Sequence, residues 1–286
     1  MAVATRAMKS PDIQVGIGSA IEKGDWKQVY DIAVKTGSLE VAKQAINGAA
    51  KAGQWGIVSQ LGISGSEPVA KCAVDKLAEA DQWHDALRYV CKQGSEPVVK
   101  YVIDKAAEAG KWAVVASTSR RGSDPIAKHA IDTAAKAGQW DVVACFYERG
   151  SEATTKYAID NLAKAGQWGP VGNIGIHVSD PIAKHAIDKA AEAGHWLTVE
   201  YISTHGTEPV AKHAIDKAAE AGNWETVLSI GAISGAKGKD PIARHAIDKA
   251  AEGGDWGTVA HIGKRAEGVA EYAEKLLAEH GAKSPK

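Results

Sequence analysis

Cations and planar rings recur at a fixed spacing along this chain, and they are the residues best suited to chemistry. The stretch DPIAKHAIDKAAEAGHW, residues 180–196, places Lys184 beside His185, with Asp188 one helical turn beyond the lysine. Rings that stand beside cations are typical of platforms on which the bases of single-stranded nucleic acid stack. The members of this Lys/ring column are Lys100, Tyr101, Lys128, His129, Lys156, Tyr157, Lys184, His185, Lys212, His213, Arg244 and His245.

An acidic row runs beside the Lys/ring column and favours a structural interpretation of it. One aspartate follows each cation by four residues, so both rows share a helix face and their fields largely cancel. We expect a solvated ionic ladder, in which Asp188 can also meet a lysine of an adjacent helix. The aspartates of this row are Asp75, Asp104, Asp132, Asp160, Asp188, Asp216 and Asp248.

Neither a metal site nor a catalytic site emerges from these residues. His185 and His213 occupy equivalent positions, but no third ligand accompanies them, so we predict no metal and no cofactor. Asp, His and Ser recur in most of the repeated segments, whereas a catalytic site normally occurs once. The repetition therefore favours structure or extended binding over catalysis.

A second candidate binding surface is a basic edge at the ends of the segments that follow the tryptophans. The helix dipole alone favours cations at a helix C-terminus. The alternative is an edge that binds an acidic peptide or nucleic acid, and any specificity is expected here because the sequence varies more than in the first helices, as ASTSRRG and ACFYERG show. The residues of this basic edge are Arg88, Arg120, Arg121, Arg149, His177 and His205.

These columns exist because the chain is a tandem repeat. Nine tryptophans stand 28 or 29 residues apart, with a last interval of 32, and such a period marks a repeat array. We place nine repeats in residues 10–266, followed by a closing helix and a short tail in residues 267–286. The tryptophans are Trp26, Trp55, Trp83, Trp112, Trp140, Trp168, Trp196, Trp224 and Trp256.

Each repeat reads as a pair of helices. In the seventh, Ser179 suits the N-cap, Pro181 suits the first turn, and Gly194 suits a left-handed helix end. Apolar residues follow at helical spacing, and a second, shorter helix begins near Trp196. We expect the indoles from Trp55 to Trp256 to form a structural seam between helices, since burying one Trp removes roughly 150–250 Å² from water. The Gly-rich insertion GAISGAKGKD in the eighth repeat is expected to form a longer surface loop.

The overall composition is that of a soluble folded chain. Its net charge is −1, with 45% hydrophobic and 24% charged residues, so no charge surplus marks it for polyanions or membranes. No stretch is apolar enough to span a bilayer, and no secretory signal is recognisable. Cys72, Cys91 and Cys145 are widely spaced, which indicates reduced thiols and a cytoplasmic, reducing location.

The repeat resembles a known family. SDPIAKHAIDKAAEAG followed by TVEYI is similar to the HEAT-like repeat of armadillo-like solenoids, here in short units with an added Trp. The resemblance implies an all-α, right-handed α-solenoid of about nine helix hairpins with a C-terminal capping helix. It also implies a binding scaffold that presents an extended, curved surface to a protein or peptide.

Two alternatives to the scaffold stay open. One is single-stranded nucleic-acid binding through the Lys/ring column or the basic edge. The other is an enzyme of the lyase or glycosylase type, which some HEAT-like proteins are, with its site in an atypical repeat such as the sixth or eighth.

Overall fold

The protein is helical throughout the part that the structure, a computed structural model, describes: residues 10–86, 94–119, 123–148 and 150–283. The chain divides into two compact units, an N-terminal unit of residues 1–142 and a C-terminal unit of residues 143–286. In these described residues the predicted all-α chain of repeating helix pairs is confirmed.

The N-terminal unit alternates longer first helices with second helices that begin at a tryptophan. Its first helices are α1 (Ser10–Glu22), α3 (Leu39–Lys51), α5 (Glu67–Glu79), α7 (Glu96–Glu108) and α9 (Asp124–Lys136). Its second helices are α2 (Trp26–Thr36), α4 (Trp55–Ser64) and α8 (Trp112–Ser119), and α10 (Trp140–Ala144) begins at its end.

The C-terminal unit follows the same alternation and adds a closing helix. Its first helices are α11 (Glu152–Lys164), α13 (Asp180–Glu192), α15 (Glu208–Glu220) and α17 (Asp240–Glu252). Its second helices are η1 (Cys145–Glu148), α12 (Trp168–Gly175), α14 (Trp196–His205), α16 (Trp224–Ala236) and α18 (Trp256–Arg265). The turn η2 (Glu267–Val269) and α19 (Ala270–Lys283) end the chain.

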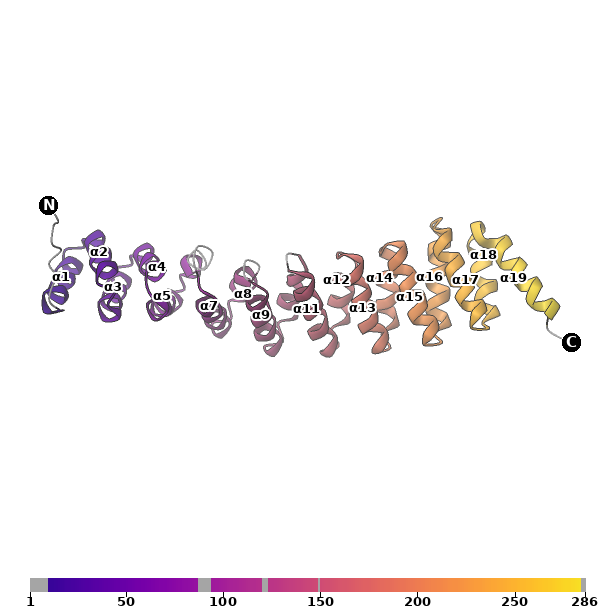
Figure 1. The fold of residues 1–286 in the computed structure, drawn as a ribbon, viewed down its shortest axis with the longest axis horizontal. Helices are drawn as coiled ribbons and strands as arrows, with labels where there is room; N and C mark the ends of the chain where they lie inside the picture. The colour runs from indigo at the N-terminus through magenta and orange to yellow at the C-terminus, as the bar shows by residue number, and fades with distance from the viewer. Residues whose placement is uncertain (1–9, 87–93, 120–122, 149, 284–286) are drawn as a thin grey trace, which may run out of the picture. The chain divides into compact units, whose positions relative to one another are not determined.

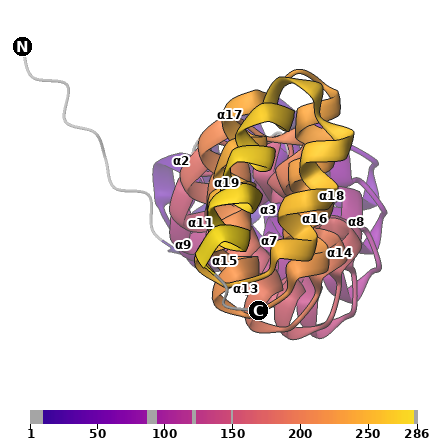
Figure 2. The same ribbon diagram turned by 90° about the vertical axis from the view of Figure 1, so that its right-hand side faces the viewer.

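Within each unit the helices form two rows. First helices pack on the preceding and following first helices, as α13, α15 and α17 do, and second helices pack on one another in the same way, as α12, α14 and α16 do (Figure 1). At the C-terminal end, α19 lies against α18 and α17, which Figure 2 shows from that end. None of the described helices combines the length and the apolar character that a membrane crossing requires.

The helix ends follow from the residue types at the corners. Ser179 has extended backbone angles at the N-cap of α13, and Pro181 occupies its first turn, where a missing N–H costs nothing. Gly194 ends the first helix with φ +69°, a conformation that glycine adopts without strain. Asp81 stands at the equivalent position with φ 58°, and Asp is among the few side chains that tolerate this region.

The core lies between successive repeats and consists mainly of Ile, Val and Ala. On α13 the buried residues include Ile182, Ala186 and Ile187, with Ile187 fully buried. A buried isoleucine contributes about 1.5–3 kcal/mol, and the alanines allow neighbouring helices to approach closely. A single helix pair cannot cover its own apolar face, so each pair is stabilised by packing against its neighbours.

The surface loop predicted for the insertion in the eighth repeat is wrong. The extra residues instead lengthen α16 to 13 residues, whereas α14 has 10. Gly231 and Gly235 lie one turn apart on its buried side, where a Cβ on Gly231 would stand 2.7 Å from that of Ala246. Glycines at this spacing leave room for a neighbouring helix, so the Gly-rich insertion is a packing surface.

We expect Gly235→Ala to destabilise the protein by about 1–3 kcal/mol, because the new Cβ would overlap the Cβ of Ala266. The loss should appear although alanine favours helix over glycine by about 1 kcal/mol. Gly56→Ala in α4 is the matched control, since a Cβ there meets nothing within 4 Å. Urea unfolding followed by circular dichroism should show opposite shifts for the two variants, and a stabilised Gly235→Ala variant would contradict this packing.

Candidate functional site

The basic edge falls mostly outside the described residues, which do not include Arg88, Arg120, Arg121 and Arg149. His177 and His205 are described and exposed, each near the end of its second helix. Each donates from Nδ1 to a carbonyl of its own chain four residues earlier, that of Asn173 or Tyr201, at 2.8 Å. Both histidines thus satisfy helix-end carbonyls, as expected for this position.

The rings of the Lys/ring column join neighbouring first helices. His213 donates from Nε2 to Asp188 at 2.7 Å, so this aspartate is bonded to a histidine of the next repeat. The hydroxyl of Tyr101 likewise donates a hydrogen bond to Asp75 on the preceding first helix. Further bonds of this kind join His129 to Asp104, His185 to Asp160, His245 to Asp216 and, from the closing helix α19, Tyr272 to Asp248.

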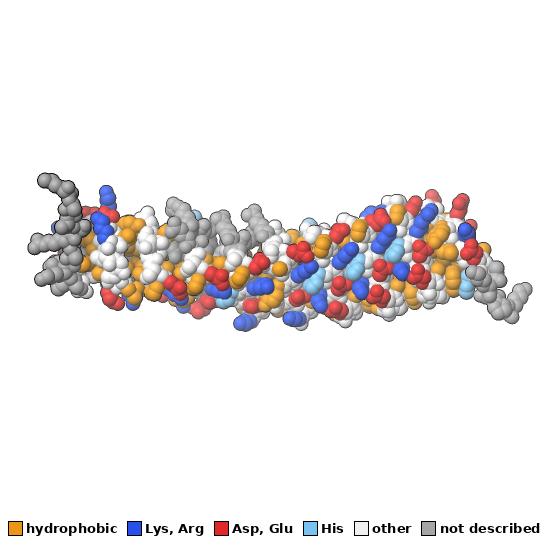
Figure 3. All heavy atoms as spheres, in the orientation of Figure 1, with side chains coloured by type: hydrophobic (Ala, Val, Ile, Leu, Met, Phe, Trp, Pro, Cys, Tyr) orange, Lys and Arg blue, Asp and Glu red, His pale blue; other side chains and the backbone are white. Residues whose placement is uncertain are grey.

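The cations of the Lys/ring column are paired largely within their own helices. Lys212 lies 2.6 Å from Glu208, one turn earlier, and Arg244 lies over the ring of Tyr272. Lys100 and Lys156 form the same i,i+4 ion pairs, as does Lys71 at the equivalent position of α5. Figure 3 shows the consequence on the visible face of the C-terminal unit, where blue and pale blue side chains alternate with red ones.

The tryptophans occupy the corner between first and second helices. Trp83 is buried, with 6% of its surface exposed, and the other eight are half-buried. Half-burial leaves part of each indole available at the surface, so these residues both stabilise the repeat and face the solvent.

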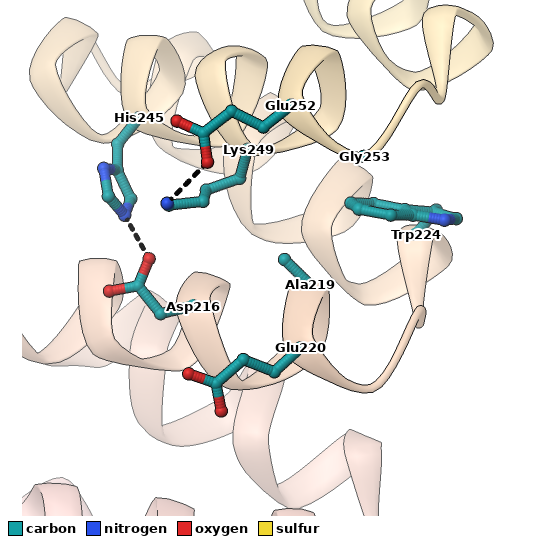
Figure 4. A pocket seen from close by; sticks show the side chains of 8 residues that line it. All are labelled: Asp216, Ala219, Glu220, Trp224, His245, Lys249, Glu252 and Gly253. Atoms are coloured by element: carbon teal, nitrogen blue, oxygen red, sulfur yellow. Dashed lines mark hydrogen bonds and ion pairs between the residues drawn. The ribbon is translucent and has the colours of Figure 1, made fainter.

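Two equivalent pockets lie beside these indoles in the C-terminal unit. The α13–α15 pocket is lined by Asp188, Ala191, Glu192, Trp196, His213, Lys217, Glu220 and Ala221. The α15–α17 pocket is lined by Asp216, Ala219, Glu220, Trp224, His245, Lys249, Glu252 and Gly253 (Figure 4). Each has a volume of about 550 Å³, and the two lists match position by position except at Ala221 and Gly253.

Gly253 allows the indole of Trp224 to lie close to the backbone of α17. A Cβ at this position would overlap the six-membered ring of Trp224, whereas the neighbouring repeat carries Ala221 there. Figure 4 shows the indole lying beside Gly253, across the pocket from His245. The two pockets therefore differ in how far the indole reaches over the first helix.

Carboxylates dominate the charge of both pockets. Each is lined by three carboxylates and one lysine ammonium. The hydrogen bond from Lys217 lowers the pKa of Glu220, and that from Lys249 lowers the pKa of Glu252. These groups thus stay ionised at neutral pH, and Glu220 belongs to both pockets.

The indoles on either side of these pockets are covered by histidine rings. His195 stacks on Trp168, with centroids 5.2 Å apart, and His280 stacks on Trp256 at 4.0 Å. Among the described residues, no ring stacks on Trp196 or Trp224.

Sequence explains the uncovered indoles. The position of His195 is taken by Asn223 in the next repeat and by Asp255 in the one after. Both of these side chains turn to the N-terminus of their own second helix, where each accepts a backbone N–H at 3.0 Å. No ring is thus supplied at these corners to cover Trp196 and Trp224.

No protein-family model, curated protein or solved structure matches this chain. Its function is therefore inferred from the geometry of its own residues. In the described part of the chain, no three His, Cys, Asp or Glu side chains come together as metal ligands would. Of the cysteines, Cys72 and Cys145 are free, and burial raises the pKa of the Cys72 thiol.

The tyrosine–aspartate contacts predict how stability depends on alkaline pH. The hydrogen bond to Asp248 and burial raise the pKa of Tyr272 above its ordinary value of about 10. The fold therefore favours the protonated phenol. Its contribution is complete below pH 10 and is lost as pH rises further, because the unfolded chain releases the proton first.

We expect Tyr272→Phe to lower stability by about 0.5–1.5 kcal/mol at neutral pH and to reduce the loss of stability above pH 10. Denaturant unfolding between pH 7 and 12 measures both effects. Tyr201→Phe, at an exposed tyrosine, is the control. Parallel pH profiles for the wild type and Tyr272→Phe would contradict the assigned contact.

Proposed function

We propose that this chain is a non-catalytic binding module whose partner is a protein or peptide. The proposal includes the architecture that the sequence resemblance implied, a right-handed, HEAT-like α-solenoid with a C-terminal capping helix. The observation that carries it is the pair of equivalent pockets beside Trp196 and Trp224. Equivalent sites in consecutive repeats suit a ligand that itself extends from one repeat to the next, as a polypeptide does.

The nucleic-acid alternative has less support from the geometry. In the Lys/ring column, the polar edges of His185, His213 and His245 are bonded to aspartates. The carboxylates of both pockets repel phosphate, whereas nucleic-acid binding depends on cations that neutralise it. We therefore propose a polypeptide partner, with nucleic acid as an outcome that the experiment distinguishes.

The enzyme alternative calls for one atypical repeat with a cavity of its own. The eighth repeat is atypical because α16 is lengthened, and its extra turn is occupied by close packing of Gly235 against α17 and Ala266. The pocket beside this repeat has the same residue types as the one before it, apart from Gly253 in place of Ala221. Repetition of that kind favours binding over a catalytic site that occurs once.

Affinity capture from a native lysate tests the proposal. We expect the immobilised protein to retain a partner that nuclease leaves in place and protease removes. The double variant Trp196→Ala/Trp224→Ala should lose it, because each substitution removes the aromatic wall of one pocket. Leu197→Ala, an exposed residue of α14 that lines neither pocket, is the control and should retain it.

Three outcomes would contradict the proposal. The first is capture that nuclease abolishes, which would indicate nucleic acid. The second is capture that the double variant retains, which would place binding elsewhere. The third is the absence of any captured partner. Circular dichroism of both variants checks that their helical content matches the wild type.

A further inference from the structure

We infer that the α13–α15 and α15–α17 pockets each hold one arginine side chain of an extended peptide segment, with the two arginines three residues apart. The inference rests on the proposed binding function and specifies the chemistry of the partner. Three features of the pockets lead to it: their charge, their indoles and their separation.

The charge of the pockets calls for a cation. In the α15–α17 pocket, three carboxylates meet two ammonium groups, because Lys249 pairs with Glu252 and Lys217 pairs with Glu220, which leaves the charge of Asp216 in excess. The α13–α15 pocket repeats this ratio, with Lys189 on Glu192 and Lys217 on Glu220 beside Asp188. Because Glu220 lines both pockets, a ligand that places a positive group in each pocket would bring both of these groups near the Glu220 carboxylate.

The indoles call for a planar group. His195 on Trp168 and His280 on Trp256 show that the corner indole accepts a flat, nitrogen-containing ring. At Trp196 and Trp224 the chain supplies no such ring from its described residues. A guanidinium is planar, stacks on aromatic faces and donates paired hydrogen bonds to carboxylates, whereas the lysine ammonium is a compact point charge. The combination of indole and carboxylates therefore favours arginine.

The separation of the pockets sets the spacing of the two arginines. Both pockets border α15, so they are one helix spacing apart, about 8–10 Å for packed helices. A polyproline II segment rises about 3.1 Å per residue with three residues per turn, so every third side chain returns to the same face after about 9 Å. An Arg-x-x-Arg segment in this conformation matches both pockets.

Fluorescence anisotropy with labelled proline-rich peptides tests the inference on the full chain. We expect an Arg-x-x-Arg peptide to bind at low ionic strength and to weaken as salt is added. Replacing both arginines by citrulline keeps the planar group and removes the charge, and it should weaken binding at least tenfold. A peptide with four residues between the arginines, or with lysines in their place, should also bind less tightly.

Protein variants locate the binding. Glu220→Gln should weaken the Arg-x-x-Arg peptide about tenfold, because it removes the carboxylate that both pockets share. Glu225→Gln is the matched control, since Glu225 is exposed on α16 and lines neither pocket. Any one of three results would overturn the inference. The arginine and citrulline peptides could bind with equal affinity, the two protein variants could have equal effects, or the Arg-x-x-Arg peptide could fail to bind.

The lysate experiment separates this inference from the proposed function. If a captured partner depends on Trp196 and Trp224 while the arginine peptides fail to bind, the peptide-binding function stands and the arginine assignment is wrong. If capture fails as well, the proposed function is wrong with it.

Discussion

The structure depends on the burial of an apolar face that no single helix pair can cover. Ile187 and Ala186 of α13 are fully buried, and so are the equivalent Ile215 and Ala214 of α15. These residues lose contact with water only because α13, α15 and α17 pack side by side. The same constraint explains α19, which covers the last pair where a further repeat would otherwise stand.

Once the apolar faces fix the stacking, the polar columns come into register. A histidine or tyrosine of one first helix meets an aspartate of the preceding one, as His213 meets Asp188. The bond is half-exposed and contributes modestly to stability, about 1 kcal/mol or less. Its main consequence is geometric, because it fixes the orientation of the rings and leaves the carboxylates of Glu192 and Glu220 beside the indoles.

Substitution at a single corner position then changes the surface without changing the core. His195 covers the indole of the preceding repeat, whereas Asn223 and Asp255 cap their own helices. The pockets beside Trp196 and Trp224 thus lie between two covered indoles, those of Trp168 and Trp256.

Much of the helix pattern could be predicted from sequence because its determinants are local. Pro181, Gly194 and the apolar steps between them specify one helix and its ends. The pockets could not be predicted, because Glu220, Lys249 and Trp224 come from different helices and meet only through packing. Sequence alone predicts a loop around Gly235, because glycines are typical both of turns and of close helix contacts, and only the packing distinguishes the two.

Deletion of one whole repeat tests most directly whether the pairs are interchangeable units stabilised by their neighbours. Removing residues 180–207 takes out 28 residues and joins Ser179 to Glu208, so that Asp160 can meet His213. We predict a folded protein with unchanged helicity per residue by circular dichroism and cooperative unfolding. Removing only residues 180–193 should unfold the C-terminal unit, because it leaves α14 without its first helix. If both deletions disrupt the fold equally, the repeats are not interchangeable and the account is wrong.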